Sequence, residues 1–147
     1  MERAAEGTDQ HTNAGGSISL SAAFEDTEPI GRPRGQARSF LAALRTVHRL
    51  PVSDRAADLV ELVVSELVTN SRKYAPGPCL LTLVLREDCV EVSVWDGNPV
   101  LPSVLPPDPY RVGQHGLEIV MAAAQAFRIE REGVGKRVTA AIALVDP

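Results

Sequence analysis

Three polar side chains fall on the apolar side of a predicted helix over residues 53–74. At about 100° per residue, Glu66, Asn70 and Lys73 project where the apolar face would otherwise continue, while a separate polar stripe covers the solvent side. An unpaired carboxylate is costly to bury, so we expect a cation, a ligand or a water-lined cavity beside Glu66. A carboxylate one helical turn from an amide oxygen suits Mg²⁺, a hard cation that keeps much of its water shell. In the alternative, these side chains reach solvent near the helix end and Glu66 pairs with a basic neighbour, which explains one such residue more easily than two.

A second acidic group ends a predicted apolar strand. Asp96 is followed by Gly97 in the stretch VSVWDGNP. An acidic residue at the mouth of a sheet can accept hydrogen bonds from a ligand amine or from a bridging water. A simple Asp-Gly turn is the common alternative, and the residues alone leave both interpretations open.

Two glycines stand at the start of a third predicted helix, in the stretch VGQHGLEIV. Gly113 and Gly116 would let backbone N–H groups approach a phosphate closely, while the helix dipole favours its negative charge. An ordinary helix start after a proline-rich loop explains the same pattern. His115 is expected to be exposed at this turn.

Period-two and helical patterns predict the elements that must hold these groups. In chain order they are a strand at 17–24, helices at 34–50 and 53–74, strands at 79–86 and 89–95, a helix from residue 113, and strands near 127–131 and 137–145. Five prolines between residues 99 and 112 exclude a regular helix or a central strand there. This order predicts an α+β two-layer sandwich, with a mixed, mostly antiparallel sheet and helices on one face. We expect residues 1–16 to be a disordered leader and residues 17–147 to form one domain.

Composition restricts the class of protein. With 147 residues, 44% hydrophobic and 23% charged, the chain can bury the core of one ordinary globular domain. A net charge of −4 argues against direct nucleic-acid binding. No apolar run approaches the length of a membrane span and no secretory leader is visible, so we expect a cytoplasmic protein without a membrane partner.

The two cysteines flank a predicted hairpin. If Glu87 and Asp88 form its turn, Cys79 lies opposite Asp96 and far from Cys89, which excludes a disulfide between the two thiols. We therefore expect two small core thiols rather than a redox or metal site.

Taken together, the three polar stretches resemble a known family. SELVTNSRKYA matches the asparagine box of the GHKL superfamily of ATP-binding domains, and VWDGNP and GQHGLEIV stand where its two glycine boxes stand. More narrowly, the chain resembles the single-domain anti-sigma factors and serine-protein-kinase-like regulators of actinobacteria. The similarity covers about residues 17–145.

The resemblance implies a Bergerat fold that holds ATP and Mg²⁺ between the helical layer and a lid. In it, Asn70 would be the Mg²⁺ ligand, Glu66 would orient or activate the nucleophile, and Asp96 would accept a hydrogen bond from the adenine amino group. The remaining nucleotide contacts would come from Lys73, Gly97, Gly113 and Gly116.

The chain departs from this family at several positions. Asn98 stands where a second glycine is usual, Gln114 and Glu118 replace glycines, Tyr74 replaces a frequent histidine, and Lys136 stands where many relatives have threonine. Side chains in loops that wrap phosphates restrict close backbone approach, so weak ATP binding or absent turnover is expected.

Two functions remain open at this stage. In the first, the protein is an ATP- and Mg²⁺-binding regulator that controls transcription through a sigma factor, an anti-sigma antagonist or a transcription factor, and that could phosphorylate a serine of the antagonist. In the second, it is a degenerate Bergerat-fold module that binds its protein partner without nucleotide. Relatives of this kind are often dimers, so the resemblance also implies a possible homodimer.

Overall fold

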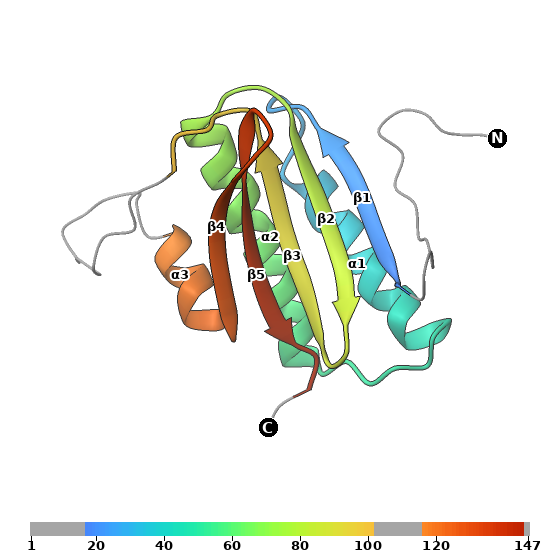
Figure 1. Cartoon of the computed structure of the whole chain (residues 1–147). Coiled ribbons are helices and arrows are strands. Elements are labelled where there is room, and N and C mark those ends of the chain that lie inside the picture. Colours follow the sequence, from blue (N-terminus) through green and yellow to red (C-terminus); the bar gives the residue numbers. More distant parts are fainter. Residues whose placement is uncertain (1–16, 102–115, 146–147) are drawn as a thin grey trace.

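One sheet backed by helices forms the domain (Figure 1). The computed structural model describes residues 17–101 and 116–145. Its elements are β1 (Ser19–Phe24), α1 (Gly31–Thr46), α2 (Asp54–Tyr74), β2 (Cys79–Arg86), β3 (Cys89–Asp96), α3 (Gly116–Ala123), β4 (Ala126–Glu132) and β5 (Gly135–Ala143). The strand order is β1-β2-β3-β5-β4, and every neighbouring pair is antiparallel. The predicted α+β sandwich with helices on one face is confirmed, and within the described residues its sheet is wholly antiparallel.

The helix α2 is the central element of the helical layer. It begins at the N-cap Ser53, whose hydroxyl accepts a hydrogen bond from the backbone N–H of Ala56 at 3.0 Å. Asp54 in its first turn and Arg72 and Lys73 in its last turn complement the helix dipole. A continuous apolar face then buries it against the sheet through Val60, Val63, Val64, Leu67 and Val68. The sequence predicted this helix with nearly these limits.

The hairpin between β2 and β3 has the predicted register. Arg86 pairs with Cys89 and Cys79 pairs with Asp96, which leaves Glu87 and Asp88 as a two-residue turn. Both thiols are free and buried, as expected, and burial raises the pKa of Cys79 to about 11. The acidic end of β3 is thereby fixed directly opposite the start of β2.

The first helix ends earlier than the sequence suggested, and the third is short. Periodicity predicted the first helix to extend to residue 50, but α1 ends at Thr46, and Arg49 adopts a positive φ of 57°. The Arg45 guanidinium donates to the carbonyl of Val52 at 2.6 Å, which holds the chain in a turn toward α2. The third helix ends at Ala123 because the next residues join the sheet, beginning with the hydrogen bond from Gln125 N–H to the carbonyl of Ala141.

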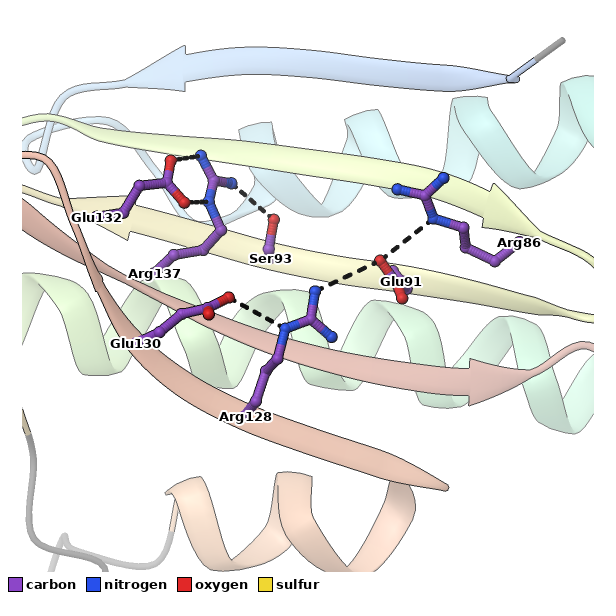
Figure 2. Close-up of polar contacts among 7 residues, drawn as sticks. All are labelled: Arg86, Glu91, Ser93, Arg128, Glu130, Glu132 and Arg137. Atoms are coloured by element: carbon purple, nitrogen blue, oxygen red, sulfur yellow. Dashed lines mark hydrogen bonds and ion pairs between the residues drawn. The ribbon is translucent and has the colours of Figure 1, made fainter. Parts of the chain in front are cut away.

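The face of the sheet turned away from the helices is polar (Figure 2). Glu91 lies between the guanidinium groups of Arg86 and Arg128, and Arg137 binds Glu132 through two hydrogen bonds of 2.7 and 2.8 Å. This outer surface is covered by exposed ion pairs, so the inner, helix-covered side is where a buried site can form.

Some predictions concern segments outside this description. The leader at residues 1–16 and nearly all of the proline-rich segment lie outside the described residues. No helix of the described part is long and apolar enough to span a bilayer.

Candidate functional site

α2 carries Glu66 and Asn70 one turn apart toward its C-terminal end. Both residues are partly buried, and their neighbours Val63 and Leu67 are almost fully buried in the core. Within residues 17–101 and 116–145, no hydrogen bond or ion pair joins either polar side chain to another residue. Within the described part of the chain, their carboxylate and amide groups therefore have unused hydrogen-bonding capacity.

The start of α3 lies directly against Glu66. A Cβ atom added to Gly116 would lie only 2.8 Å from the Glu66 Oε1 atom. The absence of a side chain thus lets the first turn of α3 approach this carboxylate, and the positive end of the helix dipole favours a negative charge there. The structure brings together two residues that are fifty positions apart and were predicted to share one site.

Asp96 differs from Glu66 because it forms an ion pair with a lysine. The Lys136 ammonium donates a hydrogen bond of 2.9 Å to Asp96 Oδ1, and the two side chains are only 2% and 3% exposed. The same ammonium donates to the carbonyl of Asn98 at 3.1 Å, and the backbone N–H of Asn98 donates to Asp96 Oδ1 at 3.0 Å. One oxygen of the carboxylate predicted to receive an adenine amino group, Oδ1, therefore already accepts two hydrogen bonds from the protein itself.

Comparisons with known proteins agree with this architecture. Residues 32–142, well over half of the chain, match the model of the histidine kinase-like ATPase domain. The chain belongs to this family.

Among solved structures, the chain is similar to the RsbU and RsbW domains of Rv1364c from Mycobacterium tuberculosis, with 22% identity and a TM-score of 0.62. This match covers 88% of the chain but only 33% of that protein. The histidine kinase domain of the blue-light activated histidine kinase of Erythrobacter litoralis matches with 18% identity and a TM-score of 0.47, over 82% of this chain and 63% of the other. The chain thus spans less than two thirds of either structure. No curated protein is similar enough to count as a match.

In this family member, strand register explains the ion pair. Asp96 at the end of β3 and Lys136 at the start of β5 are directly opposed in the antiparallel ladder. Next to them, a Cβ atom added to Gly135 would overlap the carbonyl oxygen of Asp96, so this backbone approach requires glycine. The two charged side chains therefore meet on the inner face of the sheet because of the backbone geometry.

Asn98 connects this pair to α2. Its side-chain amide donates to the carbonyl of Tyr74 at 3.0 Å, and its Oδ1 atom accepts from the backbone N–H of Val100 at 3.0 Å. In the sequence, Asn98 stood out only because it replaces a glycine that is usual in the family. In the structure it satisfies a carbonyl at the C-terminal end of α2 and holds the turn after Asp96.

The remaining predicted site residues are placed less centrally. Gly97 is exposed, and an added Cβ atom would meet nothing within 4 Å, so space does not require glycine there. Lys73 is exposed in the last turn of α2, with its ammonium 5.8 Å from the centroid of the Tyr74 ring. Gly113 lies outside the described residues, so its predicted phosphate contact stays a prediction.

The described residues fit a bound ATP and Mg²⁺ at one end only. Glu66, Asn70 and Gly116 present unpaired oxygens and a close backbone approach, which suit a hydrated cation and phosphates. No group of three or more His, Cys, Asp or Glu residues suited to a metal occurs in the described part. A Mg²⁺ ion held by Asn70 would take its other ligands from phosphate oxygens and water. The other end, at Asp96, where the base would bind, is called the base end here. It does not fit as it stands, because Asp96 is buried in an ion pair with Lys136.

Lys136 is the residue at the site whose placement sequence reasoning missed. Its position was noted as a departure from the family, yet nothing in its own segment predicts that it is buried against Asp96. The available signal was the pairing of the last two strands with β3, which would have placed a lysine opposite the carboxylate.

Proposed function

We propose that the protein is a regulator of the anti-sigma factor type that binds ATP and Mg²⁺ at the junction of α2 and α3 and controls transcription through a protein partner. The observation that carries this proposal is the pair Glu66 and Asn70, which are partly buried one turn apart on α2 and have no partner among the described residues, with Gly116 close to the Glu66 carboxylate. The family membership and the resemblance of the three motifs to anti-sigma factors support it.

The roles of the two α2 residues follow from their chemistry. The amide oxygen of Asn70 would hold Mg²⁺, which neutralises charge on the phosphates. The carboxylate of Glu66 would accept the proton of an attacking hydroxyl, the step needed to phosphorylate a serine of an antagonist protein. Sigma factors, antagonists of anti-sigma factors and transcription factors are the proposed classes of partner, and a homodimer is the proposed assembly.

Calorimetric titration with ATP, with and without Mg²⁺, tests the proposal. We expect binding that depends on Mg²⁺ and is lost in Asn70→Ala. Thr69→Ala is the matched control, because Thr69 is adjacent on α2 but exposed, and it should bind as the wild type does. Absence of binding up to millimolar ATP would contradict nucleotide-dependent regulation.

One observation favours a second candidate function. Because Asp96 is already paired with Lys136, the same fold could act as a protein-binding module without nucleotide. The affinity of the wild-type protein for a sigma factor or antagonist that binds it discriminates between the two candidate functions. Affinity unchanged by ATP, by removal of Mg²⁺ and by Asn70→Ala would support the module, whereas affinity that ATP changes would support the nucleotide-dependent regulator.

A further inference from the structure

We propose that Lys136 is an internal competitor for the amino group of the nucleotide base, so that a base can reach Asp96 only when the Lys136 ammonium has left it. This inference rests on the proposed function in one respect, namely that a nucleotide binds at this end of α2. It makes Lys136 the residue that determines base affinity and base selectivity.

The contacts of Asp96 carry the proposal. Its Oδ1 atom accepts one hydrogen bond from Lys136 at 2.9 Å and one from the backbone N–H of Asn98 at 3.0 Å. With a side chain only 3% exposed, Asp96 has almost no surface at which a ligand could reach it. The amino group of a base and the ammonium of Lys136 are both N–H donors, and the small exposed surface of Asp96 leaves room for only one of them beside the carboxylate.

The lysine is held in this position by its surroundings. Its ammonium has a second acceptor in the carbonyl of Asn98 at 3.1 Å, and its backbone is fixed opposite Asp96 in the β3–β5 ladder. Arg131, which pairs with Lys136 across β4 and β5, donates instead to the carbonyl of Pro99 at 3.2 Å. Lys136 is therefore the cation that the fold directs to Asp96.

Replacing the Lys136 ammonium at Asp96 by the amino group of a base is unfavourable. The Lys136–Asp96 bond joins two opposite charges, whereas a bond from a neutral base amino group to the same carboxylate has only one charged partner and lacks the attraction between full charges. Displacement would also separate the buried ammonium from its counter-charge, which is costly unless the side chain reaches water. Removing the ammonium should therefore strengthen binding of bases that carry an amino group.

Binding of ATP and ITP to Lys136→Thr is the direct test. ITP carries a carbonyl oxygen where ATP carries the amino group, so the two differ at the atom in question. We expect Lys136→Thr to bind ATP at least tenfold more tightly than the wild type, with a much smaller gain for ITP. Arg128→Thr is the control, because it also removes one positive charge but lies on the exposed outer face, and it should change neither affinity.

Two other outcomes separate this inference from the proposed function. If the wild type already prefers ATP over ITP tenfold and Lys136→Thr binds ATP no more tightly, the competitor role is wrong while nucleotide binding stands. If neither protein binds either nucleotide, the proposed function fails and the competitor role fails with it.

A measurement on the wild type covers the case in which Lys136→Thr does not fold. Lys73 and Lys136 are the only lysines in the sequence, so isotope-labelled lysine gives two side-chain signals in an NMR spectrum. We expect the Lys136 ammonium to be protected from exchange with water in the free protein and to lose this protection at saturating ATP. Protection that persists at saturation would overturn the proposal.

Discussion

The two ends of the proposed site differ in how their acidic groups are satisfied. At one end, Glu66 on α2 faces the start of α3 and has no hydrogen-bond or ion-pair partner among the described residues. At the other end, Asp96 on β3 is buried in an ion pair with Lys136. Within the described residues, the carboxylate on the helix has no counter-charge, while the carboxylate on the strand is paired with a lysine of the same chain.

This difference has a physical origin in the two kinds of element. A long side chain on a helix can reach toward water, so the Glu66 carboxylate can be hydrated without a protein partner. Asp96 is short, lies in a central strand and is covered by the helical layer, and a buried carboxylate requires a counter-charge or a strong donor. In this chain the counter-charge is the Lys136 ammonium.

Removing each carboxylate in turn should show the difference as stability. Asp96→Ala leaves the Lys136 ammonium buried without its partner, and we expect a loss of about 3–5 kcal/mol in the free energy of unfolding. Glu66→Ala removes an unpaired charge from a helix, and we expect a change within about 0.5 kcal/mol. Chemical denaturation monitored by circular dichroism measures both.

The double variant Asp96→Asn with Lys136→Met is the control for this comparison. It removes both charges at once and should recover most of the stability that Asp96→Ala loses, because replacing a buried ion pair by uncharged groups is often neutral. Equal losses for Asp96→Ala and Glu66→Ala would contradict the distinction between the two ends.

The glycines at the two ends provide a second, smaller contrast. Gly135→Ala places a methyl group against the carbonyl oxygen of Asp96 and the Trp95 ring, both fixed in the sheet, so we expect a loss of about 1–3 kcal/mol. Gly116→Ala meets only the flexible end of Glu66, which can rotate away, and alanine favours a helix over glycine by about 1 kcal/mol. Stability should therefore fall for the first variant and stay level or rise for the second, as thermal unfolding would show.

In Gly116→Ala, ATP binding should change in the opposite direction to stability. If Gly116 lets phosphates and Glu66 approach the same backbone, Gly116→Ala should weaken ATP binding while the protein stays folded. A variant that is both stable and fully active in binding would show that the close contact has only a packing role.

The limits of sequence reasoning follow the same division between the two ends. Glu66 and Asn70 were found because an α-helix repeats locally, so a polar residue on an apolar face stands out in a short window. The hairpin register was also accessible, since the two-residue turn at Glu87 and Asp88 fixes Cys79 opposite Asp96. These features depend on residues close together in the chain.

The ion pair could not be found in this way because its partners are 40 residues apart. Whether Lys136 meets Asp96 depends on the register of β5 against β3, and a shift of one residue would turn the lysine to the outer face. The sequence could mark Lys136 only as unusual for the family. Its burial, its second acceptor on Asn98 and the glycine beside it required the structure.

The smallest expected effect concerns the thiol next to the base end. Cys79 is opposite Asp96 in the sheet and 4% exposed, and burial raises its pKa from 9.0 to about 11. Because the folded protein holds the thiol neutral, this contribution to stability is complete below pH 9 and is lost as the pH rises from 9 toward 11. Asp96 and the thiolate would then be two negative charges on neighbouring strands, which adds to the cost of ionisation.

Comparison of the wild type with Cys79→Ala separates the stability contribution of the Cys79 thiol from that of other groups that titrate at alkaline pH. We expect the wild type to lose more stability than Cys79→Ala between pH 9 and pH 11, and denaturant unfolding at several pH values measures the difference. Burial also raises the pKa of the Cys89 thiol, so Cys89→Ala at the far end of the hairpin should show an effect of the same sign at a thiol distant from Asp96. If Lys136 were not paired with Asp96 in solution, the negative charge next to Cys79 would be uncompensated. The wild type would then lose more of its free energy of unfolding between pH 9 and pH 11, so the size of this small effect also reports on the Lys136–Asp96 pair.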